Sequence, residues 1–316
     1  MSAERLVHIL DEVPALEGLD SLTMVVALDG FLDAGSSAAI AAQHLAGLDD
    51  GGSVVATFDV DQFHDYRARR PAVTFLRDHY EAYDAPRLVV RLLRDTGGTP
   101  YLLLQGPEPD NRWEAFCRAV REVVERLGVT LVVSMGSVPM AVPHTRPIAI
   151  THHANDPSLI TATNPWQGEL RVPSSAQALL EMRLGEWGRD ALGFVAHIPH
   201  YLAQLDYPRA SVMLLEHVER SGRLTVDLTD LRAAADDREG EIARYLAANQ
   251  EVGEVVASLE RQYDSFAEAE AAGANLLADD QPIPTGEEIG RQFEQFLAGL
   301  EGPDPTDPTD HPEDES

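Results

Sequence analysis

The 316-residue sequence contains no lysine, and all 24 of its basic residues are arginine. Without lysine there can be no Schiff-base nucleophile and no P-loop lysine for the phosphates of a nucleotide. Lysine-dependent nucleotide ligase chemistry is excluded for the same reason. Several large classes of enzyme are therefore ruled out by one missing residue type.

Cysteine is nearly absent as well, because Cys117 is the only one and cannot form a disulfide within the chain. It falls inside a helical pattern, so we expect a buried thiol rather than a nucleophile. The sequence shows no apolar run of membrane-spanning length and no charged-then-apolar leader at its N-terminus. We expect a cytoplasmic protein with no membrane partner.

Positive charge is scarce relative to negative charge, since 53 acidic residues give a net charge of −29. Phosphate backbones and anionic lipids would repel such a chain, so we expect no nucleic-acid partner. A hydrophobic content of 44% is enough for a sizeable core. The length fits one large domain with additions or two small ones.

Short apolar runs alternate with helical patterns over the first 225 residues. This rhythm predicts an α/β architecture with a largely covered sheet, and Asp95–Gly98 predicts a turn between two hairpin strands. The predicted strands are 24–28, 53–58, 87–94, 101–104, 129–133 and 192–198, and the predicted helices are 38–45, 113–127, 174–188 and 208–221.

Polar side chains gather where predicted strands end, which is where ligand sites lie in open α/β sheets. Three prolines stiffen the loop that carries His144, Thr145 and Arg146, and a second Pro-His sequence places His200 and Tyr201 after a later strand. The two loops could face one cleft. A structural role, in which these side chains tie loop carbonyls together, competes with a catalytic one and is favoured on residue types alone.

Two acidic groups have simpler explanations than ligand binding. Asp29 and Asp33 flank a glycine loop before a helix, where their charges would oppose a phosphate, so we expect them to cap the helix or meet an arginine. Ser36 or Ser37 is the expected cap. The segment 59–71 mixes acids, a histidine and arginines without metal-ligand spacing, which favours an ion-pair network or an interface over a metal site.

The remaining chain is predicted to be helical and then disordered. A heptad seam runs from Ile242 to Phe266 with one polar break at Asn249, and it can pack on a helix at 287–300 or between chains. Residues 164–168 read as a loop. We divide the chain into an α/β core at 1–225, a helical extension at 226–302 and a disordered acidic tail at 303–316.

Five signatures, in order, resemble the longer bacterial branch of the proteasome assembly chaperone 2 family. They are Leu28–Gly35, Phe63–Pro71, Gly106–Pro109 with Arg112-Trp113, Val142–Pro147 and Val195–Tyr201. The resemblance implies a three-layer α/β/α sandwich related to the nucleoside phosphorylase and hydrolase fold, followed by a C-terminal helical extension.

The resemblance also implies a function, because eukaryotic members are non-catalytic chaperones that guide assembly of the proteasome α-ring. We therefore expect a non-enzymatic chaperone or assembly factor that acts on protein complexes, with proteasome subunits as candidate partners and no cofactor. We also expect a homo-oligomer, a trimer being one candidate size. Some such factors dock through a hydrophobic–tyrosine–any-residue tail, which the sequence ending Glu313-Asp-Glu-Ser316 does not match.

Two alternatives remain open. The first is a nucleoside phosphorylase-like or hydrolase-like enzyme, or a small-ligand-binding protein, that uses a cleft at the strand ends lined by Asp33, Asp65, His144, Arg146 and His200. The second is a scaffold assembled through the heptad helices. The candidate cleft or clamp residues, none assigned as catalytic and none as a metal ligand, are Asp29, Asp33, Asp65, Tyr66, Arg69, Arg70, Glu108, His144, Arg146, His200 and Tyr201.

Overall fold

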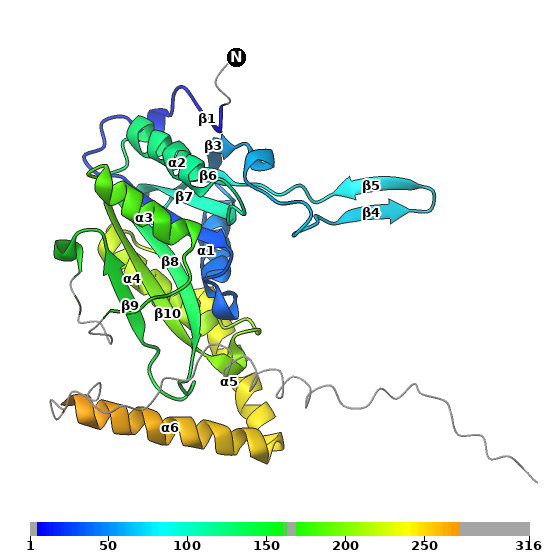
Figure 1. Ribbon diagram of the computed structural model, residues 1–316, viewed down its shortest axis with the longest axis vertical. Coiled ribbons are helices and arrows are strands. Elements are labelled where there is room, and N and C mark those ends of the chain that lie inside the picture. The colour runs from blue at the N-terminus through cyan, green and yellow to red at the C-terminus, as the bar shows by residue number, and fades with distance from the viewer. Residues whose placement is uncertain (1–4, 161, 163–168, 272–316) are drawn as a thin grey trace, which may run out of the picture. The chain divides into compact units, whose positions relative to one another are not determined.

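The computed structural model describes residues 5–160, 162 and 169–271 (Figure 1). Three predictions lie outside these residues: the loop at 164–168, the helix at 287–300 and the disordered tail at 303–316. The predicted helical extension is described as far as residue 271.

Among the described residues, an eight-stranded mixed sheet has the strand order β1-β3-β6-β7-β2-β8-β10-β9. The neighbouring strands β7, β2, β8 and β10 run parallel, and the outer strands pair antiparallel, including β6 with β7 as the predicted hairpin. The strands are β1 (Val7–Ile9), β2 (Thr23–Asp29), β3 (Ser53–Phe58), β6 (Val89–Arg94), β7 (Pro100–Pro107), β8 (Leu131–Met140), β9 (Ile150–Ala154) and β10 (Asp190–Pro199).

Helices cover both faces of this sheet. The long helices are α1 (Ser37–Leu48), α2 (Trp113–Leu127), α3 (Ala176–Glu186), α4 (Pro208–Gly222), α5 (Thr229–Ala248) and α6 (Gln250–Ala271). Short 3-10 turns are η1 (Pro14–Leu16), η2 (Ala34–Ser36), η3 (Val60–Gln62), η4 (Pro157–Leu159) and η5 (His200–Leu202). No helix in the described ranges has both the length and the apolar character that crossing a membrane requires.

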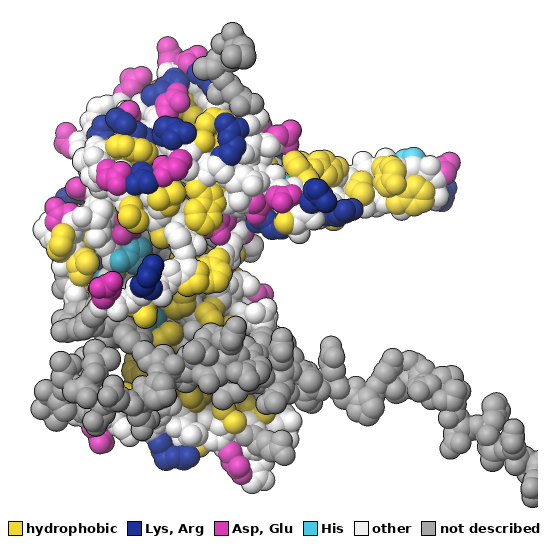
Figure 2. Space-filling view, viewed as in Figure 1, with side chains coloured by type: hydrophobic (Ala, Val, Ile, Leu, Met, Phe, Trp, Pro, Cys, Tyr) yellow, Lys and Arg dark blue, Asp and Glu magenta, His cyan; other side chains and the backbone are white. Residues whose placement is uncertain are grey.

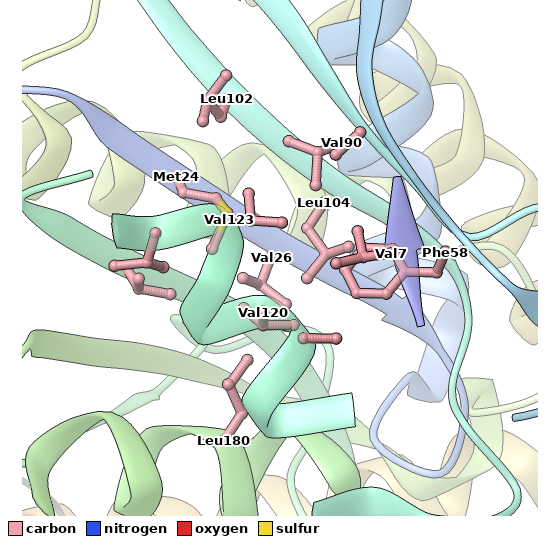
Figure 3. Close-up of a cluster of buried hydrophobic side chains, with 14 of the residues drawn as sticks. Val7, Met24, Val26, Phe58, Val90, Leu102, Leu104, Val120, Val123 and Leu180 are labelled. Carbon is pink, nitrogen blue, oxygen red and sulfur yellow. The ribbon is translucent and has the colours of Figure 1, made fainter. Parts of the chain in front are cut away.

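Residues on the central strands alternate between two apolar clusters, one on each face of the sheet. On β2, Met24, Val26 and Leu28 belong to one cluster, whereas Val25 and Ala27 belong to the other. Helices α2 and α3 close the first cluster, part of which Figure 3 shows, and α1, α4 and α5 close the second. Period-two alternation with apolar residues on both sides is typical of a buried sheet. The predicted three-layer α/β/α arrangement is confirmed.

Cys117 lies on the buried face of α2. It is a free, fully buried thiol, as its place in the helical pattern predicted. Burial raises its pKa to about 12, so the thiolate does not form at neutral pH.

The strands β4 (Val73–Leu76) and β5 (His79–Tyr83) form a separate two-stranded sheet. The hairpin extends away from the eight-stranded sheet (Figure 1), and every residue of both strands is exposed. The sequence reasoning did not predict this element.

The heptad seam is not one continuous helix. Asn249 leaves the helical conformation, with φ −130° and ψ 87°, so that α5 ends before it and α6 begins after it. Its side-chain amide donates to the carbonyl of Tyr245, which satisfies one of the free carbonyl groups at the end of α5. The polar break thus separates two helices instead of fixing the register of one.

Contacts group the chain into two compact units, Met1–Tyr263 and Asp264–Ser316, and α6 crosses this boundary. Within the first unit, α5 contributes Leu231 and Ile242 to the core on the α4 side of the sheet. The predicted division at residue 225 remains a prediction, and α5 packs with the elements that precede that position.

Candidate functional site

The carboxylate of Glu108 joins two segments that meet at the carboxyl ends of β2 and β7. These strands run parallel with Asp29 opposite Pro107, which brings the residues that follow each strand together. The Oε2 atom of Glu108 accepts a hydrogen bond from the backbone N–H of Phe31 (3.2 Å), and Oε1 accepts one from that of Ala176 (2.7 Å) at the start of α3. Both carboxylate oxygens of Glu108 therefore bind backbone N–H groups.

Gly30 is required for this arrangement. A Cβ atom at residue 30 would lie 2.2 Å from Oε2 and 2.6 Å from Cβ of Glu108. Neither approach is sterically allowed, so the glycine that follows Asp29 at the end of β2 is explained by the space that the glutamate occupies. Asp29 lies beside this contact. Burial raises its pKa above the ordinary value, and the nearby charge of Arg69 opposes that effect.

Asp33 caps α1. Its two carboxylate oxygens accept hydrogen bonds from the backbone N–H groups of Ala38 (2.6 Å) and Ala39 (3.2 Å). Burial raises the pKa of Asp33, and these two donors partly oppose the rise. A cap from Asp33 is one of the two roles predicted for the acidic pair, whereas the side chains of Ser36 and Ser37 do not cap the helix.

The segment 59–71 forms an ion-pair network. Arg69 donates from Nη2 to Asp110 Oδ1 (2.7 Å) and to the carbonyl of Glu108 (2.6 Å). Asp110 also accepts from the backbone N–H of Asp65 (2.7 Å), while the carboxylate of Asp65 accepts from the N–H of Arg67. Burial alone would raise the pKa of Asp110, but the Arg69 guanidinium and the Asp65 N–H outweigh it and hold that pKa below its ordinary value.

The two remaining candidates of this segment face solvent. The hydroxyl of Tyr66 donates to Asp61 Oδ1, and this hydrogen bond is the main reason that the pKa of Tyr66 rises to about 12. Arg70 is exposed just before the β4–β5 hairpin. The described residues contain no group of three side chains arranged to hold a metal ion.

A second cluster forms where β8 and β10 end. These strands pair in register over ten residues, from Leu131↔Asp190 to Met140↔Pro199, so the two Pro-His loops start side by side. The backbone N–H of His144 donates to the hydroxyl of Tyr201 (2.9 Å), and His144 Nδ1 lies 2.7 Å from the same oxygen. The two loops therefore do meet.

The same loop is attached to α6 through its other polar residues. Thr145 donates its hydroxyl hydrogen to Glu260, and Arg146 Nη1 lies 3.4 Å from Glu260 Oε1. Arg146 thus meets an acid on the last described helix, far along the chain, and is not paired with Asp65.

Burial dominates the electrostatics of this second cluster. It lowers the pKa of His144 and of His200, which keeps both imidazoles neutral near pH 7, and it raises the pKa of Tyr201. Within the described residues, His200 Nδ1 and the hydroxyl of Tyr207 are buried without a hydrogen-bond partner in the protein. Such groups commonly bind an ordered water.

The cavities do not coincide with the predicted cleft. A cavity lined by His64 and Glu108 measures about 10 Å³, room for about one water molecule. A larger cavity of about 270 Å³ lies at the β9 edge of the sheet and has His152, His217, Arg220 and Phe194 in its wall. None of the sequence-predicted candidates lines this larger cavity.

The adjacent histidines on β9 point to opposite faces, as successive residues of a strand do. His152 packs against Phe194 and His217, whereas His153 Nδ1 lies 2.7 Å from Glu181 Oε2 on α3. The sequence reasoning did not connect His152 with His217, because only the packing of α4 on the sheet brings them together. It also did not single out the exposed aromatic residues of the β4–β5 hairpin.

A family model for PAC2 matches residues 27–246. The chain belongs to the PAC2 family. The resemblance based on the five signatures is thus confirmed. The matched region includes the candidate residues, most of α5 and every strand of the sheet except β1 and the first part of β2.

Solved structures of similar proteins match over most of their length. A Mycobacterium tuberculosis protein of unknown function, Rv2714, is 45% identical with a TM-score of 0.80, covering 85% of this chain and 92% of its own. A Corynebacterium glutamicum protein of unknown function is 33% identical, with a TM-score of 0.78 and coverage of 84% and 99%. The M. tuberculosis proteasome-assembly chaperone homologue Rv2125 is 28% identical, with a TM-score of 0.69 and coverage of 74% and 100%. No curated protein matches the chain.

Proposed function

We propose that this PAC2-family protein is a non-enzymatic chaperone or assembly factor that acts on protein complexes, with proteasome subunits as its partners, in the cytoplasm. Family membership supports this proposal, as does the 28% identity to a proteasome-assembly chaperone homologue over that relative's whole length. A negative surface also suits selective protein binding, because it disfavours adventitious contact with nucleic acid and anionic membranes.

One structural observation carries most weight in the choice against catalysis. The polar residues at the strand ends hold backbone: Glu108 binds two N–H groups, Asp33 binds two more, and Arg69 binds Asp110 and a carbonyl. A catalytic group needs a free atom within hydrogen-bond reach of a substrate. In the proposed function these residues set the shape of the loops that a protein partner would contact.

The direct test is recovery of a partner. The tagged chain is expressed in the organism that encodes it and isolated under mild conditions, with the tag alone as control, and the bound proteins are identified and quantified. We expect proteasome subunits, enriched in assembly intermediates over the mature particle, in stoichiometric amount. Recovery of neither a proteasome subunit nor any other stoichiometric protein would contradict the proposal.

The competing enzyme hypothesis has its own test, which uses His144 because it contacts Tyr201, the residue next to the buried His200. A metabolite library is screened for compounds that raise the melting temperature, and any hit is repeated on His144→Ala. A hit whose effect is lost in that variant, followed by turnover, would favour a nucleoside phosphorylase-like or hydrolase-like activity. Absence of a hit leaves the assembly-factor proposal as the better account.

A further inference from the structure

The cavity of about 270 Å³ lies toward the other end of the sheet from the two Pro-His loops. His152 on β9 pairs with Phe194, which lies in the first half of β10, whereas the loops follow the carboxyl ends of β8 and β10. Helix α4 contributes His217 and Arg220 to the cavity from near its C-terminal end. The cavity is therefore a separate feature from the candidate residues described above.

Part of the wall of this cavity is apolar and aromatic. Ile160 and Leu192 supply aliphatic surface. The ring of Phe194 has its centroid 5.1 Å from that of His152 and 5.2 Å from that of His217, and the two imidazole centroids are 5.0 Å apart. An apolar cavity of about 150 Å³ is enough to hold benzene. The larger volume here therefore has room for an aromatic ring with a short side chain.

Arg220 brings a positive charge to the same wall. Its Nε donates to the backbone carbonyl of Glu216 (2.9 Å), whereas the carboxylate of Glu216 pairs with Arg232 on α5 (3.0 Å). Within the described residues, no carboxylate lies close enough to Arg220 to form an ion pair with it. Arg220 is also exposed, so a ligand that enters from solvent can reach its guanidinium.

Several arginines elsewhere on the surface are paired with acids. Figure 2 shows dark blue and magenta side chains interspersed over α2, where Arg121 pairs with Glu125 (2.8 Å). Arg183 on α3 pairs with Glu114 in the same way. An arginine without such an acid is where a bound anion meets least competition, and a guanidinium binds a carboxylate through two parallel hydrogen bonds. Arg220 therefore favours a carboxylate as the charged group of a ligand.

His217 supplies a second polar group. Its Nδ1 lies 2.8 Å from the carbonyl of Met213, which can only accept, so Nδ1 carries the hydrogen and Nε2 has the lone pair in the neutral ring. Arg220 Nη2 is 3.3 Å from the same Nδ1, but both atoms are then donors and form no hydrogen bond. Nε2 has no hydrogen-bond partner among the described residues. Once protonated, Nε2 can donate to an anion that Arg220 holds.

We propose that this cavity binds a small aromatic carboxylic acid, with the ring against Phe194 and the carboxylate on Arg220 and His217. The apolar part of the wall receives the ring, and the single negative charge matches the guanidinium. A phosphate monoester carries a charge of about −1.5 to −2 at neutral pH, and it would lack a second cation while the histidines are neutral. The inference does not rest on the assembly function proposed above.

Binding should take up a proton. Burial lowers the pKa of His217, and the charge of Arg220 adds to this effect. The charged and titratable groups around His217 on α4, α5 and β9 are Glu216, Arg220, Arg232, His152 and His153. A bound carboxylate favours the protonated ring. The affinity should therefore rise as the pH falls from 8 to 6, by up to about tenfold per pH unit for one proton.

Calorimetric titration of the full chain with phenylacetate and 3-phenylpropionate is the first test. Both acids are ionised at pH 6 and at pH 8, because carboxyl groups have pKa values of about 4. The matched amides keep the ring and lose the charge, and propionate keeps the charge and loses the ring. We expect at least one of the two acids to bind with a Kd below about 1 mM at pH 6, and its amide and propionate to bind at least about tenfold more weakly.

Variants locate the site. Arg220→Gln should weaken binding of the acid at least about tenfold and leave binding of the amide unchanged. Arg223→Gln, at an exposed position three residues further along that does not line the cavity, is the control. His217→Asn keeps a donor for the Met213 carbonyl but removes Nε2, so it should reduce the rise in affinity at low pH. Thermal unfolding checks that each variant folds.

Failure of both acids to bind with a Kd below about 1 mM at pH 6 would overturn the proposal. So would equal affinity for an acid and its amide, or an equal loss of affinity in Arg220→Gln and Arg223→Gln. An affinity that does not change with pH would exclude His217 from the site. Binding that is lost in His144→Ala and kept in Arg220→Gln would place the ligand at the Pro-His loops instead.

Discussion

Gly30 shows how a single residue links two motifs of this family. The absence of a side chain lets Glu108 approach closely enough to bind both the Phe31 and Ala176 N–H groups. The glycine was visible in the sequence, but its reason was not, because the contacts join residues 77 and 68 positions apart. Local pattern carries no information about such a partner.

Gly30→Ala should therefore lower the free energy of unfolding by about 1–3 kcal/mol, since the added Cβ displaces a carboxylate that holds two backbone donors. Gly47→Ala is the matched control, because a Cβ at this position in α1 meets nothing within 4 Å. That change should be neutral or stabilising by about 1 kcal/mol through helix propensity. Urea denaturation of both variants measures the difference, and equal effects would contradict this account of Gly30.

Replacement of Arg69 should also lower the free energy of unfolding. Arg69→Gln loses the ion pair with Asp110, and we expect a loss of about 1–2 kcal/mol because the pair is partly exposed. The pKa of Asp110 is lowered in the folded state, so its contribution is complete above the ordinary value of 3.8 and is lost as the pH falls below it. The acid limb of the stability curve should accordingly be flatter in Arg69→Gln than in the wild type.

The neighbouring variant Arg67→Gln provides the control for this prediction. Arg67 is exposed and lies two residues away, so its replacement should change stability by less than about 0.5 kcal/mol. If Arg67→Gln gave the same pH profile as Arg69→Gln, the loss of one positive charge, and not the loss of the Asp110 contact, would explain the flatter acid limb.

At the scale of elements, the alternation of strands and helices was predictable because burial on both sheet faces leaves continuous apolar runs. The β4–β5 hairpin was missed for the opposite reason. Its apolar residues, such as Phe75 and Tyr80, pack mainly on each other, so they form no core run. The break at Asn249 was seen as a polar position, but whether such a residue fixes register or ends a helix depends on the tertiary contacts of α6.

Thr145 and Arg146 both contact Glu260, and we call these two contacts the latch. We expect the latch to hold the His144 loop on α6. Glu260→Ala should increase hydrogen exchange in both the loop and the first half of α6, while changing global stability by less than about 1 kcal/mol. Glu254→Ala, on the same helix but bonded to Gln250, is the control and should leave exchange in the loop unchanged. Unaltered exchange in Glu260→Ala would contradict the latch.

The whole molecule should be sensitive to mild acid. Burial is the main reason that five histidines have pKa values below the ordinary value of 6.5. They are His144, His152, His197, His200 and His217. The unfolded chain then binds more protons than the folded one below that value. Stability is therefore complete above about pH 6.5 and should fall as the pH decreases toward 5.

Net charge acts in the other direction, because protonation reduces the self-repulsion of a chain with a charge of −29. The measurement is therefore made in high salt, where that repulsion is screened. His197→Gln, which removes one buried imidazole, should flatten the slope by up to about 1.4 kcal/mol per pH unit. A wild-type stability that rises between pH 6.5 and 5 in high salt would contradict this prediction.

Cys117 gives the protein a built-in chemical reporter. The single thiol is buried in α2 with its pKa raised to about 12, so alkylating reagents can reach it and find a reactive thiolate only after the helix leaves the sheet. The rate of modification in the native buffer then measures how often α2 separates from the sheet, and no other thiol in the chain competes for the reagent. The same unmodified chain can therefore be measured alone and after addition of a candidate partner protein.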